Sequence, residues 1–102
     1  MKNIFPAHDF SYDSARMRIY HANKGEGLAK HSHLYAHGTF CMSGSCKISN
    51  SRKEMIMTKE TQPINLVAEE WHEIEALEDG TVFCNVFADK FSDHKPIYNE
   101  VA

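Results

Sequence analysis

The sequence lacks several features that would assign it to a large class of proteins. It has no apolar run of about 18 residues, the length that a membrane-spanning helix needs. Its first residues, MKNIFPAHDF, contain no apolar stretch of the kind that signal peptides carry. Lys and Arg number 11 against 14 Asp and Glu, and they form no cluster. We therefore expect a cytoplasmic protein that binds neither membranes nor nucleic acid.

Cysteine is also scarce. The chain has three cysteines, Cys41, Cys46 and Cys84, and no two of them have the CxxC spacing. An odd number without that spacing indicates neither a disulfide framework nor a cysteine zinc site. We interpret all three as small buried side chains on strands.

The length and the local patterns predict one all-β domain. A chain of 102 residues can form a single core that buries roughly 60 to 70% of the unfolded surface. We place the core at 16–87, with an N-terminal arm at 1–15 and a C-terminal tail at 88–102 that contains a short helix around Phe91. Short strands separated by turns indicate a barrel or sandwich rather than βαβ units. The expected strands are 16–21, 39–42, 46–49, 54–58, a strand within 61–68, 71–77 and 81–87.

Three of the seven histidines lie within seven residues, at His31, His33 and His37. On a strand, His31 and His33 share a face and lie roughly 6.6 Å apart. His37 reaches the same point only if the chain folds back between them, which predicts a hairpin through 34–36. A helix is the alternative, because His33 and His37 are four residues apart and Gly38 could end it. The helical metalloprotease motif needs Glu directly after its first His, where this chain has Leu.

A fourth histidine lies on a later predicted strand, WHEIEAL. His72, Ile74 and Ala76 share one face of that strand, and Trp71 and Glu73 lie on the other. The first face is apolar, so His72 is expected to point inward. Alone, such a histidine is usually a hydrogen-bonded core residue.

The spacing of these residues resembles the first signature of the cupin superfamily. That resemblance is carried by Gly25, His31, His33, His37 and Gly44, with His37 in the position where Glu is usual. A histidine in this position is similar to the four-histidine branch of small single-domain cupins.

The second cupin signature is present only in its histidine. His72 stands where the family has a ligand histidine, whereas four other positions depart from the pattern. Glycine, proline, glycine and asparagine are usual where this chain has Thr61, Val67, Glu69 and Ala76. The resemblance covers roughly 16–87.

The resemblance implies a fold and a metal site. The fold would be a conical double-stranded β-helix, or jelly-roll barrel, in a homodimer that covers exposed strand edges. Its four histidine ligands would be His31, His33, His37 and His72. Imidazole suits zinc, copper, iron and nickel, and the resemblance adds manganese, so we expect one divalent transition-metal ion. By the same resemblance, Phe40 and Met42 follow His37 at inward positions and line the substrate pocket.

The expected function is a metal-dependent enzyme acting on a small organic substrate. The resemblance favours dioxygenase-type oxidation over isomerase or lyase chemistry. Tyr35 either lines the pocket, where it donates a proton or orients the substrate, or is an exposed turn residue. Glu73 points away from His72, so no catalytic acid or base is assigned. The alternatives are a non-catalytic module that binds or senses a small ligand or the metal, and a metal-free structural barrel.

Overall fold

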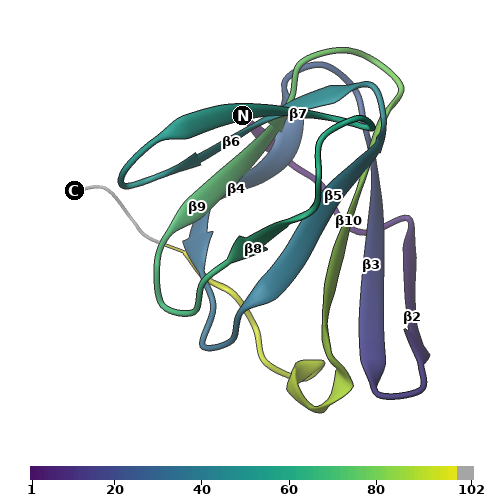
Figure 1. Cartoon of the computed structure of the whole chain (residues 1–102), viewed down its shortest axis with the longest axis vertical. Coiled ribbons are helices and arrows are strands. Elements are labelled where there is room, and N and C mark those ends of the chain that lie inside the picture. The colour runs from purple at the N-terminus through teal and green to yellow at the C-terminus, as the bar shows by residue number, and fades with distance from the viewer. Residues whose placement is uncertain (99–102) are drawn as a thin grey trace.

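The computed structural model describes residues 1–98, which form two β-sheets that face each other (Figure 1). The elements are β1 (Lys2–Asn3), β2 (His8–Tyr12), β3 (Ala15–Ala22), β4 (Glu26–Ser32), β5 (His37–Ser43), β6 (Ser45–Asn50), β7 (Glu54–Thr58), β8 (Ile64–Leu66), β9 (His72–Ala76), β10 (Thr81–Ala88), the 3₁₀-helix η1 (Asp89–Phe91) and β11 (Ile97–Tyr98). Within residues 1–98, no helix is long and apolar enough to cross a membrane.

Sheet A has the strand order β1-β4-β9-β6-β7, with β11 also paired to β4, and sheet B has the order β2-β3-β10-β5-β8. Every pairing is antiparallel except that of β1 with β4. From β3 to β10 the chain changes sheet at each connection except that between β6 and β7. This winding is a jelly roll, and it confirms the all-β fold expected from the sequence.

The core fills the space between the sheets because apolar side chains alternate along each strand. On β9, Ile74 and Ala76 are fully buried, and on β10 Phe83 is fully buried, where it stacks on Tyr20 of β3. The inner face of β9 therefore agrees with the alternation seen in the sequence. Since His72 begins the same row, the alternation also carries that histidine inward.

The sequence predicts a hairpin through 34–36 and another at Ser43-Gly44-Ser45, and both connections are corners between the sheets. The segment 33–36 links β4 in sheet A to β5 in sheet B, and Gly44 links β5 to β6 in sheet A. Gly44 has a φ of 72°, and a Cβ on it would overlap Thr81. A hairpin would pair the two strands that it joins, whereas these corners send successive strands to opposite sides of the core.

The first 15 residues have more regular structure than the sequence indicated. Pro6 separates β1, which pairs with β4 at the edge of sheet A, from β2, which forms the edge of sheet B. All five residues of β2 are exposed. In β2, Phe10 and Tyr12 alternate with Asp9 and Ser11, which is the two-residue period of a strand, so the sequence contains a short signal that the prediction of an arm did not use.

Candidate metal centre

The four predicted histidines converge from three segments at one end of the core. His31 lies near the end of β4, His33 directly after it, His37 at the start of β5 and His72 at the start of β9. His31 and His72 are directly opposed across the β4–β9 pairing. All four side chains are buried, with exposed fractions between 2% and 7%. The fold-back expected between His33 and His37 therefore takes place, although it is a corner between sheets.

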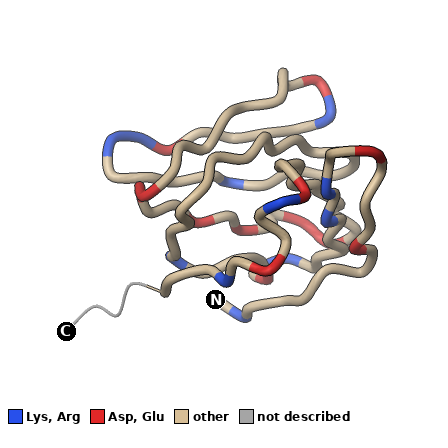
Figure 2. The backbone as a smooth tube through the Cα atoms, turned by 90° about the horizontal axis from the view of Figure 1, so that it is seen from below, with Lys and Arg blue, Asp and Glu red and all other residues tan. Residues whose placement is uncertain are grey.

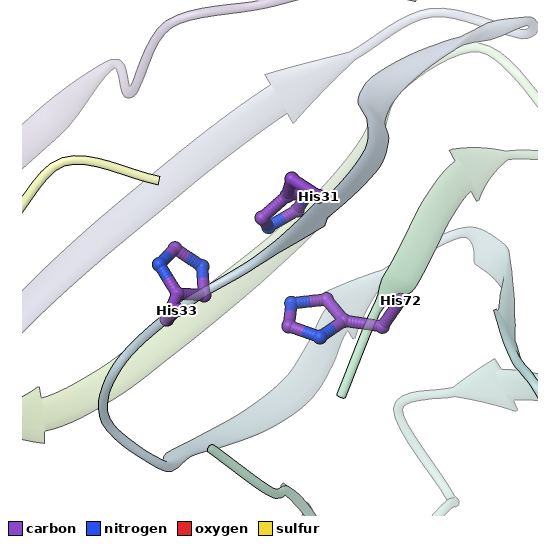
Figure 3. A group of neighbouring side chains, drawn as sticks. All are labelled: His31, His33 and His72. Carbon is purple, nitrogen blue, oxygen red and sulfur yellow. The ribbon is translucent and has the colours of Figure 1, made fainter. Parts of the chain in front are cut away.

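The rings lie at distances that suit a shared ion. Each of His31, His33 and His72 offers a ring nitrogen, and these three nitrogens lie within 4.8 Å of one another (Figure 3). Nε2 of His37 lies 3.2 Å from Nε2 of His72. The structure thus brings His37 next to the group formed by the other three.

Backbone carbonyls orient two of the rings. Nδ1 of His31 lies 2.6 Å from the carbonyl oxygen of Ala29, and Nδ1 of His72 lies 3.3 Å from that of Glu70. A carbonyl only accepts, so in each pair the imidazole donates its Nδ1 proton. The Nε2 atom of each neutral ring then keeps its lone pair.

A side-chain relay orients the third ring. The hydroxyl of Thr39 donates to Oδ1 of Asn85 at 2.7 Å, and Nδ1 of His37 lies 3.0 Å from the same hydroxyl oxygen. Because the hydroxyl proton is directed at Asn85, the Thr39 oxygen accepts the Nδ1 proton of His37. His37 therefore also presents a bare Nε2. Thr39 and Asn85 are both buried, so water does not compete strongly for this relay.

These tautomers bring two lone pairs together. With both Nδ1 atoms protonated, the facing Nε2 atoms of His37 and His72 have no proton between them, so their lone pairs repel unless a cation lies close by. Two nitrogens at about 2.1 Å from one ion and at right angles are about 3.0 Å apart. The observed 3.2 Å is close to that value. The donor set therefore fits a transition-metal ion, with outer hydrogen bonds of the kind that metal-binding histidines make.

Burial keeps the rings neutral, as metal ligands must be. It lowers the pKa of His37 to about 2, that of His33 to about 3 and that of His72 to about 4, and it lowers the pKa of His31 as well. Repulsion between the clustered rings adds to the effect of burial on His33, His37 and His72. Nδ1 of His33 is buried without a hydrogen-bond partner among residues 1–98.

A cavity of about 560 Å³ opens beside the cluster. Its wall includes His31, His33 and His37, together with polar and aromatic side chains from several strands. The other lining residues are Asn3, Ile4, Phe5, Pro6, Asp9, Arg18, Tyr20, Leu28, Tyr35, Asn85, Phe87, Lys95, Pro96 and Tyr98. A space of this size accommodates a small organic molecule.

Arg18 places a cation in this cavity. One of its terminal nitrogens, Nη2, donates to the carbonyl oxygen of Ser92 at 3.1 Å, and its guanidinium carbon lies 4.9 Å from the centre of the Phe87 ring. Nε of Arg18 lies 3.3 Å from Oδ2 of Asp9, but the two atoms do not form a hydrogen bond because the N–H bond is not directed at that oxygen. Asp9 accepts instead from Nε of Arg16, at 2.6 Å. The positive charge of Arg18 is thus only partly neutralised by its neighbours.

Tyr35 lines the cavity, and the interpretation of this residue as an exposed turn tyrosine is wrong. Its side chain is 4% exposed and stacks on Phe87 and on Phe91 of η1, at centroid distances of 4.9 and 5.3 Å. Burial raises its pKa and raises that of Tyr20 to about 12. Both phenols are therefore protonated at neutral pH and can donate hydrogen bonds.

Phe40 and Met42 do not line the cavity, contrary to the prediction. On β5 the buried residues are His37, Thr39 and Cys41, whereas Met42 is 46% exposed and Phe40 is half-buried on the opposite face. The reason is the two-residue period of a strand. Because His37 points inward, Thr39 and Cys41, which lie two and four positions later, also point inward. Phe40 and Met42, three and five positions later, point the other way.

Thr39, Asn85 and Arg18 are not among the residues predicted from the sequence. Thr39 could have been found from the same two-residue period, since it follows His37 by two positions. Arg18 alternates with Met17 and Ile19 on β3, so its inward direction is visible only once the buried face of that strand is known. No local signal identifies Asn85, which reaches Thr39 through the β5–β10 register.

No protein-family model and no curated protein matches the sequence. Solved structures do match. A cupin 2 domain-containing protein from Halorhodospira halophila superposes with a TM-score of 0.73 over 87% of this chain, at 15% identity. A conserved protein from Klebsiella pneumoniae with a double-stranded β-helix domain superposes with a TM-score of 0.68 over 88%, at 14% identity. The chain has the cupin fold.

The fold indicated by the histidine spacing is thus confirmed. This chain spans 61% of the Halorhodospira protein and 80% of the Klebsiella protein. A structure of the DMSP lyases RdDddP and RnDddQII also contains a similar chain, with a TM-score of 0.73 and 16% identity over 87% of this chain and 46% of the lyase chain. At these identities the similarity concerns the fold, and the chemistry has to be argued from the site.

Proposed function

We propose that this cupin binds one divalent transition-metal ion and is a metal-dependent enzyme acting on a small organic substrate. The observation that carries the proposal is the convergence of four buried, neutral histidines beside a cavity of about 560 Å³. The proposed ligands are His31, His33, His37 and His72. Imidazole donors suit iron, nickel, copper or zinc better than calcium and magnesium, which prefer oxygen. Manganese is included because of the cupin resemblance.

The charge of the site favours an anionic substrate. Four neutral ligands would leave the +2 charge of an ion uncompensated. Arg18 and Lys95 line the same cavity, with Asp9 as the one acidic side chain in its wall among residues 1–98. A carboxylate or enolate would therefore be attracted to the site. Arg18 is placed to bind such a group with charge-assisted hydrogen bonds.

Two tyrosines supply the proton donors of the proposed site. Tyr20 and Tyr35 line the cavity, and their raised pKa values keep both hydroxyls protonated. The stack of Tyr35 between Phe87 and Phe91 holds its ring in one orientation. These residues would orient the substrate and donate hydrogen bonds to charge that develops on its oxygens. A bound metal would add Lewis acidity or the capacity to bind O₂.

For the reaction we propose dioxygenase-type oxidation of an enol or aromatic substrate. A lyase or isomerase reaction is the second candidate, and the similarity to a DMSP lyase chain favours it. A non-catalytic module that binds a small ligand or the metal is the alternative to both. Oxygen consumption by the iron-loaded protein with a panel of small organic acids would distinguish the first candidate from the other two.

The primary test is metal content. The protein is purified without chelator or histidine tag, and elemental analysis is compared between the wild type, the His31→Ala/His72→Ala double variant and His94→Ala. His94 is exposed, so its substitution is a matched control. We expect about one transition metal per chain in the wild type and in His94→Ala, and none in the double variant. Equal metal contents in all three proteins, after reloading, would contradict the proposal.

A further inference from the structure

The cavity beside the histidines has a buried floor and an exposed mouth. In the floor, the three lining histidines, Tyr20 and Phe87 are buried, with exposed fractions of at most 7%. We call the part of the wall that the segments 3–6 and 95–98 supply the mouth. There Phe5 is 91% exposed and Tyr98 is 54% exposed. The floor thus carries the histidine nitrogens, and the mouth carries two aromatic rings that water still reaches.

The N-terminal part of the mouth is a bridge between the two sheets. The backbone amide of Ile4 donates to β4 of sheet A at 3.0 Å, and that of Ala7 donates to β3 of sheet B at 2.8 Å. Between them, the ring of Pro6 fixes its own φ and favours an extended conformation for Phe5. The backbone that carries Phe5 is therefore held at both ends.

The C-terminal part of the mouth lies close to the histidine cluster. β1 and β11 both pair with the edge of β4 that faces away from β9, so the two terminal segments lie on the same side of the molecule (Figure 2). On β11, Tyr98 is directly opposite His31, and the centres of their rings are 6.0 Å apart. A ligand that reaches His31 therefore also reaches the mouth.

Phe5 is an apolar ring kept in water at the edge of a cavity. Single exposed hydrophobic residues are common on protein surfaces, so the exposure alone indicates nothing. Phe5 differs from them because its backbone is fixed and its side chain lines a cavity. A ligand in the cavity would cover part of the ring, and the removal of apolar surface from water favours binding. A segment already held in place also loses little conformational entropy when the ligand binds.

The cavity is larger than a simple anion requires. At about 30 Å³ per water-sized group, roughly 19 such groups fit in its volume of about 560 Å³. A carboxylate group bound by Arg18 would fill only a small part of this space. The remainder extends to the mouth, where the side chains that a ligand would contact are mainly apolar.

We propose that the substrate is a carboxylic acid with an apolar body, an aryl or alkyl group, and that Phe5 and Tyr98 select for this body. The inference rests on the proposed function, because it takes the substrate to have an anionic head that binds at the floor, near Arg18. The apolar body then points to the mouth. An aromatic body would stack on these rings or meet them edge to face, the arrangements that aromatic pairs prefer.

A dicarboxylate is the rival ligand, because the mouth also contains Lys95. Lys95 is the one charged residue among 3–6 and 95–98. Its side chain is exposed, and ion pairs between exposed side chains contribute little because water and salt screen them. The contact with the two rings therefore outweighs the contact with Lys95.

The test is calorimetry on the full, metal-loaded chain with 3-phenylpropionate and with propionate, which has the same carboxylate but no ring. We expect the wild type to bind 3-phenylpropionate at least about tenfold more tightly. Phe5→Ala should reduce this preference by roughly 3- to 10-fold and leave the affinity for propionate unchanged. Tyr12→Ala is the matched control, because Tyr12 is 74% exposed on β2 and lies outside the cavity wall. It should keep the full preference.

Four results would overturn the inference. They are equal affinities of the wild type for the two acids, an undiminished preference in Phe5→Ala, an equal loss in Tyr12→Ala, and tighter binding of glutarate, a dicarboxylate, than of 3-phenylpropionate. Because Phe5 is 91% exposed, its substitution leaves the core intact.

Metal content measured on the same samples separates this inference from the proposed function. A protein that holds no metal but prefers 3-phenylpropionate, with the preference reduced in Phe5→Ala, supports the selection by the mouth although the proposed enzyme fails. A metal-loaded protein that binds both acids equally overturns the selection and leaves the proposed metal site standing.

Discussion

The Nε2 atoms of His37 and His72 lie 3.2 Å apart, although 35 positions separate the two residues in the chain. His37 begins β5 in sheet B and His72 begins β9 in sheet A. The contact therefore depends on how the two sheets pack, as well as on the local conformation of either strand. Each ring is also held from its Nδ1 side, by Thr39 and by the carbonyl group of Glu70.

Thr39→Val tests the relay that orients His37. Valine has nearly the shape of threonine but cannot accept the Nδ1 proton of His37, and it leaves Oδ1 of Asn85 without its donor. Loss of such an outer hydrogen bond typically lowers metal affinity by 10- to 100-fold. We expect that loss in a competition titration against a chromophoric chelator. Thr39→Ser keeps the hydroxyl and should bind metal within about threefold of the wild type. Equal affinities for the valine and serine variants would show that the relay has no role.

Arg18→Met tests the attraction of the cavity for anions. A hydrogen bond to a charged group contributes about 1.5 to 3 kcal/mol, which corresponds to roughly a 10- to 100-fold change in affinity. We expect calorimetry on the metal-loaded protein to show that loss for malonate, while metal content stays unchanged because Arg18 is not a proposed ligand. Arg52→Met, at an arginine whose side chain is 82% exposed, is the control. Binding of malonate and its neutral analogue malonamide with equal affinity would contradict an anion site.

The sequence is sufficient to predict the four histidines of the candidate site. It is less informative about the connections between strands and about which sheet each strand joins. Histidine spacing and the alternation on β9 identify four side chains that the fold does bring together. The corner at Gly44 could not be distinguished from a hairpin, because its glycine-containing turn is compatible with both. Which sheet each strand joins is decided by long-range pairing. The inward positions of Phe40 and Met42 were implied by the cupin resemblance, whereas the two-residue period of the strand turns both side chains away from the face of His37.

Acid should destabilise the metal-free protein. The pKa values of His33, His37 and His72 are lowered in the folded state to about 3, 2 and 4, whereas histidines of the unfolded chain take up protons near pH 6.5. Below pH 6.5 the unfolded state therefore binds more protons, and stability falls as pH falls toward the folded values. Between these pKa values, each of the three histidines lowers the free energy of unfolding by about 1.4 kcal/mol for every pH unit of acidification. Together they lower it by roughly 4 kcal/mol per pH unit.

Urea titrations of the metal-free protein between pH 8 and pH 5, followed by Trp71 fluorescence, would measure this effect. We expect the urea concentration at the unfolding midpoint to be nearly constant above pH 7 and to decrease steeply below about pH 6. His33→Gln, which removes one titrating group, should make the decrease shallower. A midpoint that does not change down to pH 5 would mean that the histidines are not kept neutral by burial.

Gly27→Ala should destabilise the fold and weaken the metal site together. A Cβ on Gly27 of β4 would overlap the carbonyl oxygen of Ile74 on β9. Gly25 has a φ of 86°, as expected for a turn glycine, but at Gly27 the glycine is needed for this close approach of two strands. The neighbouring strand would have to move, and it carries His72. Overpacking of this kind costs about 1 to 3 kcal/mol.

Gly38→Ala is the matched control for this substitution. Gly38 also lies on a strand of the barrel, but a methyl group added there would have its nearest neighbouring atom 3.9 Å away, an ordinary contact. We expect thermal unfolding to show a lower midpoint and a lower metal affinity for Gly27→Ala, and values close to wild type for Gly38→Ala. If the two variants behave alike, the contact between Gly27 and Ile74 does not set the spacing of β4 and β9. Since that spacing places His31 opposite His72, the result also measures how far the site depends on the fit of these two backbones.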